Sequence, residues 1–309
     1  MKTYLTLLSI ALWSSSYSQI DWSVKEEFKG PVKSVTSYTY SDDHSWRVST
    51  CPDTVTVADY NSIKITVILF DKEKRPIKSI MIGTAYCIWA YDDIGREIKQ
   101  TDYRDSNRLE RTIEYSYEKN GATIEKNYDN KGKLYSTWVR EIDSANFICR
   151  YYELIKGKID DDYVSTLNNS FLPLSSFTID SKGNRVQYQE LSYDDKNRKI
   201  SSAFYSVDSS IYDHYENRYN KKGNIIEITK FNKEGQIIGL TNQQFDEFGN
   251  VIQILRYYLK DINYFTTDVE RIDYTYDEHG NWTSKKIYSE YASGKDYQTS
   301  KIIRTIEYY

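Results

Sequence analysis

A short pattern recurs along this chain and constrains its fold more than any other feature. It consists of an aromatic residue or Ile, then Asp or Asn, two variable residues, Gly, and a residue such as Asn, Arg, Lys or Gln. Internal repetition of this kind is typical of proteins built from one supersecondary unit used many times. Clear copies begin at Tyr91, Tyr128, Ile179, Tyr219, Phe231, Phe245 and Tyr276, and degenerate copies begin at Phe70, Tyr117 and Tyr193.

The chemistry of the pattern predicts a tight turn. An Asp or Asn side chain caps a turn by accepting hydrogen bonds from backbone N–H groups further on, and Gly accepts the positive φ of a type I turn with a G1 bulge. Asn197 replaces this Gly in one copy, as expected of a residue that tolerates the left-handed region. The flanking stretches 113–117 and 271–276 place Tyr and Ile at every second position, which indicates strands. The predicted fold is therefore all-β, an antiparallel meander of repeated β-hairpins forming an extended or partly wrapped sheet.

Composition supports this fold and excludes several classes. The chain has 309 residues, of which 31 are Tyr, a residue that favours strands. A helical bundle, a coiled coil, a collagen-like fibre and a polytopic membrane protein are excluded. Acidic residues (45) outnumber basic ones (41), so we expect no nucleic-acid partner.

Residues 1–18 read as a secretory signal peptide. Lys2 is followed by an apolar stretch at 4–13 and by small residues at 14–18, which places cleavage before Gln19. The apolar run is too short to cross a bilayer as a helix, although a membrane anchor or a buried first strand is the alternative interpretation. No Cys follows the run, so a lipoprotein anchor is not expected. The mature chain is predicted to be secreted or periplasmic and not membrane-spanning.

The spacing of the turns suggests two similar halves. Copies beginning at 91, 117 and 128 are matched by copies at 193, 219 and 231, offsets of 102 or 103 residues. The pattern is lost between them. The predicted organisation is a signal peptide (1–18), an N-terminal half (19–142), an irregular connection or insertion (143–176) and a C-terminal half (177–309).

At these turns the chain resembles the YD-repeat (RHS-type) family and secreted YD-like proteins of Bacteroidetes. The resemblance lies in residues 91–96 with 101–102, in residues 274–282, and in the opening stretch 28–35 with 38–40, and it covers about 28–142 and 177–309. It implies a β-strand array in an extracellular or envelope location. It also implies carbohydrate binding or a role in toxin delivery. Repeat-like sequence continues to Tyr309, so we expect no appended effector domain.

Residues that could carry catalysis or bind a metal form no recognisable motif. His44, His214 and His279 each follow an acidic residue, but neighbours in a strand point to opposite faces. Nucleotide-binding, serine-hydrolase and EF-hand motifs do not occur. Residues 160–162 are three consecutive Asp, which could bind Ca²⁺ but more simply form a solvated loop. Cys51, Cys87 and Cys149 contain no CxxC pair, which leaves both a single disulfide and three reduced thiols open.

We therefore predict no catalytic, cofactor-binding or metal-binding residue and no cofactor. The aromatic surplus is the stronger functional indication, because exposed rings suit stacking on sugars or contact with a protein. The hypothesis is a non-catalytic secreted or envelope protein that binds a carbohydrate or a protein partner. An immunity or accessory factor of a toxin-delivery system and a hydrolase with a dispersed carboxylate site are the alternatives. The tryptophans considered for stacking are Trp22, Trp46, Trp89, Trp138 and Trp282.

Overall fold

A computed structural model describes residues 28–41, 63–104, 107–119, 121–180, 182–206, 210–261, 264–290 and 296–309. The predicted signal peptide, His44, Cys51, Trp22 and Trp46 lie outside these ranges. The strands are Val32–Ser41 (β1), Ile63–Phe70 (β2), Pro76–Met81 (β3), Ala85–Tyr91 (β4), Glu97–Arg104 (β5), Arg108–Tyr117 (β6), Thr123–Asp129 (β7), Leu134–Asp143 (β8), Ile148–Ile155 (β9), Lys158–Leu167 (β10), Pro173–Ile179 (β11), Arg185–Tyr193 (β12), Lys199–Tyr205 (β13), Ile211–Tyr219 (β14), Ile225–Phe231 (β15), Ile237–Phe245 (β16), Val251–Asp261 (β17), Tyr264–Tyr276 (β18), Trp282–Glu290 (β19) and Asp296–Tyr308 (β20).

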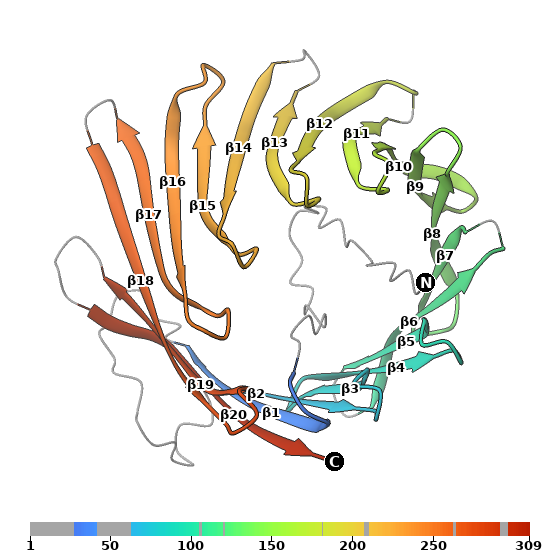
Figure 1. The fold of residues 1–309 in the computed structure, drawn as a ribbon. Coiled ribbons are helices and arrows are strands. Elements are labelled where there is room, and N and C mark those ends of the chain that lie inside the picture. The colour runs from blue at the N-terminus through green and yellow to red at the C-terminus, as the bar shows by residue number, and fades with distance from the viewer. Residues whose placement is uncertain are drawn as a thin grey trace.

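The strands form one 20-stranded antiparallel sheet in which each strand pairs with its neighbours in the sequence. The prediction of an all-β meander is confirmed. The expectation of an open or partly wrapped sheet is wrong, because β1 also pairs with β20, from Val32 opposite Tyr308 to Ser41 opposite Ser300. This pairing closes the sheet into a barrel (Figure 1). Closure removes the two unpaired edges that an open sheet would expose.

The turns of a meander alternate between the two ends of a barrel. One end of the barrel carries the β2–β3 and β4–β5 turns and every later turn that leads from an even-numbered strand to the next odd-numbered one. We call this end the capped rim and the other end the opposite rim. At the capped rim, Asp92 Oδ1 accepts the N–H groups of Ile94 (3.1 Å) and Arg96 (2.8 Å). Gly95 has φ +86°, and its N–H donates to the carbonyl of Asp92. The predicted Asp-capped turn with a positive φ at its fourth residue is therefore confirmed.

Turns of the capped rim follow one another at a nearly constant interval. The 102-residue offset noted in the sequence corresponds to four hairpins of this length. Residues 143–176, where the pattern weakens, contain β9, β10 and the start of β11 rather than an irregular connection, and strand pairing continues through them. The turns begin at Asp71, Asp92, Glu118, Asp143, Asn168, Asp194, Asn220, Asp246 and Asp277, so that six of the eight intervals are 25 or 26 residues.

The tyrosine that opens a repeat joins its hairpin to the preceding one. Tyr219, the last residue of β14, donates its hydroxyl to the carbonyl of Lys199, the first residue of β13, at 2.7 Å. Backbone pairing between these two strands has already ended at Ser201 and Glu216, so the tyrosine hydroxyl replaces a ladder hydrogen bond there. Equivalent bonds join Tyr91 to Pro76 (2.8 Å), Tyr117 to Glu97 (2.7 Å) and Tyr193 to Pro173 (2.9 Å).

The arginine that ends some repeats supports the same contact. Arg96 Nε lies 2.7 Å from Asp92 Oδ2 within its turn, and its guanidinium lies 4.2 Å from the ring centre of Tyr117. Arg198 repeats the arrangement with Asp194 (2.7 Å between Nε and Oδ2) and with the ring of Tyr219 (4.6 Å). A guanidinium over an aromatic face is attracted to it. Each such turn is therefore tied to the tyrosine of the following hairpin.

The two ends of the described chain meet at the capped rim. Val32, Val35 and Phe70 form a buried cluster, and Phe28 packs on it with its ring centre 5.6 Å from that of Phe70. The N–H of Tyr309 donates to the carbonyl of Pro31 at 2.9 Å, and its hydroxyl donates to the carbonyl of Phe70 at 2.6 Å. The seam between β20, β1 and β2 is thus held by apolar packing as well as by strand pairing.

The register separates side chains that face the lumen from those that face outward. The first described residues lie on the inner side of the sheet (Figure 1), and there Phe28 packs against Val35 and Phe70. Residues directly opposite one another share a face. Following the register from Val35 through Ile68, Ser79 and Cys87 to Asp102 gives the lumenal face of β1 to β5.

Burial agrees with this assignment, because side chains on a concave face converge. Cys87 is fully buried, and Asp102 is 7% exposed. Cys87 and Cys149 are free thiols, and Cys51 is not described. Within the described residues, no helix has the length and apolar character needed to cross a membrane.

Candidate ligand-binding wall

Three aromatic rings stack on the lumenal face of β8, β9 and β10. The ring centres of Trp138 and Tyr151 are 4.7 Å apart with planes inclined by 16°. Tyr163 completes the group at 6.5 Å from Trp138 and 6.3 Å from Tyr151. We call these three residues the aromatic wall. All three side chains are half-buried, so the stack is packed at its base and still presents ring surface.

The register places the aromatic wall on the lumenal side. Ile113, which follows Arg111 by two positions on β6, lies opposite Asn127, and Asn127 lies opposite Ser136. Arg111 itself lies opposite Asp102 of the lumenal face. Trp138 follows Ser136 by two positions and therefore shares its face.

Carboxylates surround the aromatic wall. Glu125 lies directly opposite Trp138 on one side, and Glu153 lies opposite it on the other. Oxygens of Glu153, Asp160 and Asp161 all lie within 4.8 Å of one another. Burial raises the pKa of the Glu153 carboxyl, and the negative charges of Asp161 and Asp160 raise it further. Burial and the Asp160 charge likewise raise the pKa of Asp161. The group therefore carries a concentrated negative potential beside the rings.

The three consecutive aspartates divide between the two faces of the sheet. Asp162 faces outward and makes a two-point ion pair with Arg150, with Nε–Oδ1 at 2.9 Å and Nη2–Oδ2 at 2.8 Å. Asp160 and Asp161 join Glu153 instead. The three Asp side chains therefore do not converge on one Ca²⁺ site. Residues 160–162 belong to β10 and do not form the predicted solvated loop. Exposed acidic groups of this kind commonly occur without a bound ion.

The sequence did not identify Glu153 as a candidate site residue, because its proximity to these aspartates depends on a turn that lacks the repeat pattern. Lys156 and Gly157 have φ values of +52° and +77° and join β9 to β10 directly. Ile155 then pairs with Lys158 and Leu154 with Ile159, which brings Glu153 to the bulge at 160–161. The Lys-Gly dipeptide between two strand-like stretches was the available signal.

A second set of buried charges continues the lumenal face toward β5. Arg111 Nε lies 2.5 Å from Asp102 Oδ2. Burial, with the charges of Glu125 and Asp102, raises the pKa of Glu97 to about 7. One oxygen of Glu97, Oε1, is buried without a hydrogen-bond partner in the described structure. The lumenal face from β5 to β10 is therefore rich in carboxylates.

Other residues considered from the sequence have packing or turn roles. Trp89 is 8% exposed, and Trp282 is covered by the guanidinium of Arg304 at 3.3 Å. His279 lies in an exposed turn 3.7 Å from Glu278, although adjacent residues were expected to point apart, because a turn does not alternate as a strand does. His214 stacks on Phe231 at 4.9 Å and lies 3.1 Å from the Ser201 hydroxyl. Of the described tryptophans, only Trp138 belongs to the aromatic wall.

Fold and site together define a closed antiparallel β-barrel with an aromatic, carboxylate-rich lumenal wall. No protein-family model matches the chain, so the resemblance to YD-repeat proteins stays a prediction. No curated protein is similar to it in sequence.

Among solved structures, a porin-like protein from Bacteroides uniformis is similar over 90% of this chain and 99% of its own, with 11% identity and a TM-score of 0.40. The Tc holotoxin pore of Photorhabdus luminescens is similar over 76% of this chain and 15% of its own, with 14% identity and a TM-score of 0.29. A Bacteroides fragilis protein of unknown function is similar over 38% of this chain and 88% of its own, with 14% identity and a TM-score of 0.24. Similarities this weak carry no functional argument.

Proposed function

We propose that this chain is an exported, non-catalytic β-barrel protein that binds carbohydrate along its aromatic wall. The observation that carries the proposal is the stack of Trp138, Tyr151 and Tyr163 beside Glu125 and Glu153. Flat rings pack against the C–H faces of pyranoses, and carboxylates accept hydrogen bonds from sugar hydroxyls. The signal-like sequence at 1–18 supports export to the periplasm or the exterior.

The charge of the site narrows the ligand class. Glu125, Glu153, Asp160 and Asp161 would repel a polysaccharide that carries carboxylates or sulfates. A neutral glycan supplies hydroxyl donors without that repulsion. We therefore expect neutral oligosaccharides to bind and polyuronates not to bind.

Isothermal titration calorimetry against neutral gluco-, xylo-, manno- and chito-oligosaccharides tests the proposal. W138A should weaken binding by about tenfold or more, because it removes the largest ring of the stack. Tyr188 is a matched control: its ring packs at a tilt against that of Tyr205, with centres 5.3 Å apart, but the register places this pair on the outer face. Binding that is absent across the panel, or that Y188A reduces as much as W138A does, would refute carbohydrate binding at the aromatic wall.

Glycoside hydrolysis is a second candidate, favoured by the proximity of Glu153 and Asp161. Their oxygens lie within 4.8 Å, near the separation used by retaining glycosidases, and the pKa of each carboxyl is raised. Chromatography of the same oligosaccharides after incubation with the protein separates the candidates. Products that disappear with E153Q would establish hydrolysis, whereas unchanged oligosaccharides support the non-catalytic proposal. The immunity or accessory role stays a prediction of the sequence resemblance.

A further inference from the structure

Arg140 lies on the lumenal face beside the aromatic wall. It follows Trp138 by two positions on β8 and lies directly opposite Tyr151 of β9, so its side chain shares their face. On its other side it lies opposite Thr123 of β7, which has a smaller side chain. Arg140 is half-buried, and β8 runs from it to the capped-rim turn that begins at Asp143. The aromatic wall therefore has a cationic neighbour on its capped-rim side.

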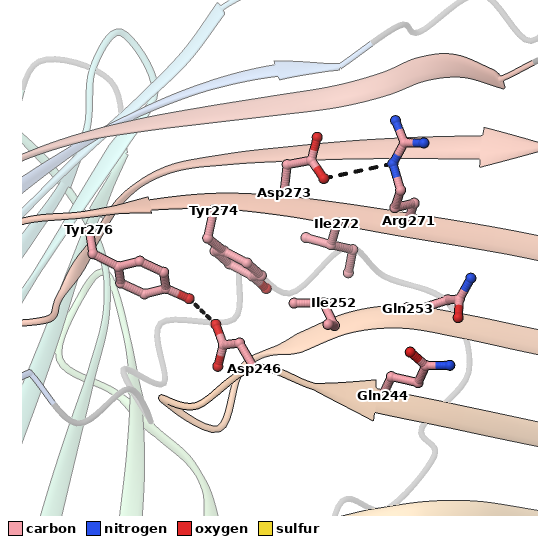
Figure 2. A pocket seen from close by; sticks show the side chains of 9 residues that line it. All are labelled: Gln244, Asp246, Ile252, Gln253, Arg271, Ile272, Asp273, Tyr274 and Tyr276. Carbon is pink, nitrogen blue, oxygen red and sulfur yellow. Dashed lines mark hydrogen bonds and ion pairs between the residues drawn. The ribbon is translucent and has the colours of Figure 1, made fainter.

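The guanidinium of Arg140 makes no hydrogen bond, ion pair or ring contact within the part of the chain that the structure describes. Every other described arginine makes at least one such contact or another electrostatic interaction. Arg271 is an example: it lines a pocket at β17 and β18, where Figure 2 shows it joined to Asp273, with 3.7 Å between Nε and Oδ1. Among the described arginines, Arg140 alone thus keeps all five of its N–H donors for a ligand.

The nearby carboxylates do not neutralise Arg140. Glu125 accepts a hydrogen bond from the side-chain amide of Asn127 at 2.9 Å. Glu153 lies two positions beyond Tyr151 on β9, which is about 7 Å along the strand, and the two aspartates of its cluster follow after the turn to β10. The binding site therefore has a cationic end on its capped-rim side and an anionic end on its opposite-rim side, and the stacked rings lie along the line between them.

We propose that the aromatic wall prefers glycans that carry a single carboxylate at one end, and that Arg140 determines this specificity. The ligand carboxylate pairs with the guanidinium, because the paired N–H groups of arginine match two carboxylate oxygens. The sugar rings stack on Trp138 and Tyr151, and hydroxyls further along the glycan donate to Glu153. A second carboxylate there would meet Glu153 and its neighbouring aspartates and be repelled, so the site selects one negative charge rather than many.

This inference rests on the proposed function and narrows its ligand class, because neutral glycans bind the same wall but leave Arg140 without an anionic partner. Isothermal titration calorimetry of the full mature chain tests it with cellotriose, xylotriose, mannotriose and chitotriose. Each trisaccharide is used as its alditol, which is neutral, and as its aldonate, which carries one carboxylate at the reducing end. A matching set that ends in one glucuronic acid residue places the carboxylate at the non-reducing end.

For at least one trisaccharide, a carboxylated form should bind the wild type about fivefold to tenfold more tightly than the alditol does. R140Q should remove this preference and change the affinity for the alditol by less than about twofold. R140K keeps the charge but not the planar pair of donors, so it should retain part of the preference. K126Q is the matched control, because it removes one positive charge from the adjacent strand β7 on the outer face, where Lys126 lies opposite Glu114, and it should leave the preference unchanged.

The wild type supplies a second readout that needs no variant. Its preference for the carboxylated form should shrink at about 1 M sodium chloride, because salt screens the ion pair with Arg140. The inference is overturned if alditols and carboxylated forms bind the wild type equally, or if R140Q or salt leaves the preference intact, and in each case binding of the alditols still supports the proposed function. If no form of any trisaccharide binds, the proposed function is overturned as well.

Discussion

The two rims of the barrel are built from the same kind of turn but are connected differently. At the capped rim, a turn such as 194–198 is bonded through Arg198 to its own Asp194 and contacts Tyr219 of the next hairpin. At the opposite rim, the turn that begins at Asp180 bonds only within itself in the described structure, through Lys182 and Asn184. Contacts between neighbouring hairpins are not confined to the capped rim, because at the opposite rim Tyr86 donates its hydroxyl to Asn107 at 2.9 Å. The arginine–tyrosine contact nevertheless recurs at the capped rim, which indicates that it helps to fix the position of neighbouring hairpins there.

The largest expected effect concerns the seam at the capped rim. F70A removes a ring that is 4% exposed from the cluster with Val32 and Val35, so the free energy of unfolding should fall by about 3–5 kcal/mol. F177A, near the opposite rim, removes a half-buried ring that contacts Arg185 and should cost about 1–2 kcal/mol. Urea denaturation followed by circular dichroism measures both. Equal losses would show that the capped rim is no more constrained than the opposite rim.

A smaller effect should appear as a pH dependence of stability at the capped-rim end of β5. The pKa of Glu97 is raised to about 7, mainly by burial and then by Glu125 and Asp102. The folded protein therefore binds this proton more tightly than the unfolded chain, and the free energy of unfolding falls as pH rises from about 4.5 to about 7. E97Q should remove this decrease, raising stability by on the order of 2 kcal/mol at about pH 8 and little at about pH 4.5.

Urea denaturation of wild type and E97Q across that pH range measures the difference. E114Q is the control, because Glu114 pairs with Lys99 on the outer face. If the free energy of unfolding depends on pH in the same way for wild type and E97Q, then the folded protein does not raise the pKa of the Glu97 carboxyl.

The smallest effect tests the contact between hairpins directly. D194A removes both the turn cap and the support of Arg198, so it should lower the midpoint of urea denaturation more than D180A, which removes a cap alone. Each substitution is also measured together with Y219F. The effects of D194A and Y219F should be non-additive, while those of D180A and Y219F should add. Additive effects in both pairs would show that Arg198 does not couple the Asp194 cap energetically to Tyr219.

The local structure was predictable because each repeat encodes it within a few residues. The Asp cap and the left-handed fourth residue follow from side-chain chemistry alone, as Asp92 and Gly95 illustrate. Even the degenerate copy at Phe70 forms the turn, with the non-glycine Lys74 at φ +64°. The role of Tyr219 was not predictable, because its acceptor belongs to the preceding hairpin and the pattern shows only alternation.

Closure and the aromatic wall depend on relations that the repeat does not encode. Nothing in β1 or β20 alone marks them as partners, since Ser34 and Glu307 meet across 273 positions of sequence. Both faces of the sheet also carry Tyr and Ile, so the sequence did not distinguish lumen from exterior. Trp138 was among the candidate stacking residues, but Tyr151 and Tyr163 became its neighbours only once the register of β8 to β10 was known.

The seam between β1 and β20 has a consequence for how the barrel assembles. Every other strand pair joins neighbours in the sequence, so those contacts form by short searches. Joining β1 to β20 closes a loop of nearly the whole chain, which costs on the order of 5 kcal/mol in chain entropy. Since that cost falls on a single pairing, we expect hairpin formation to be fast and ring closure to set the folding rate.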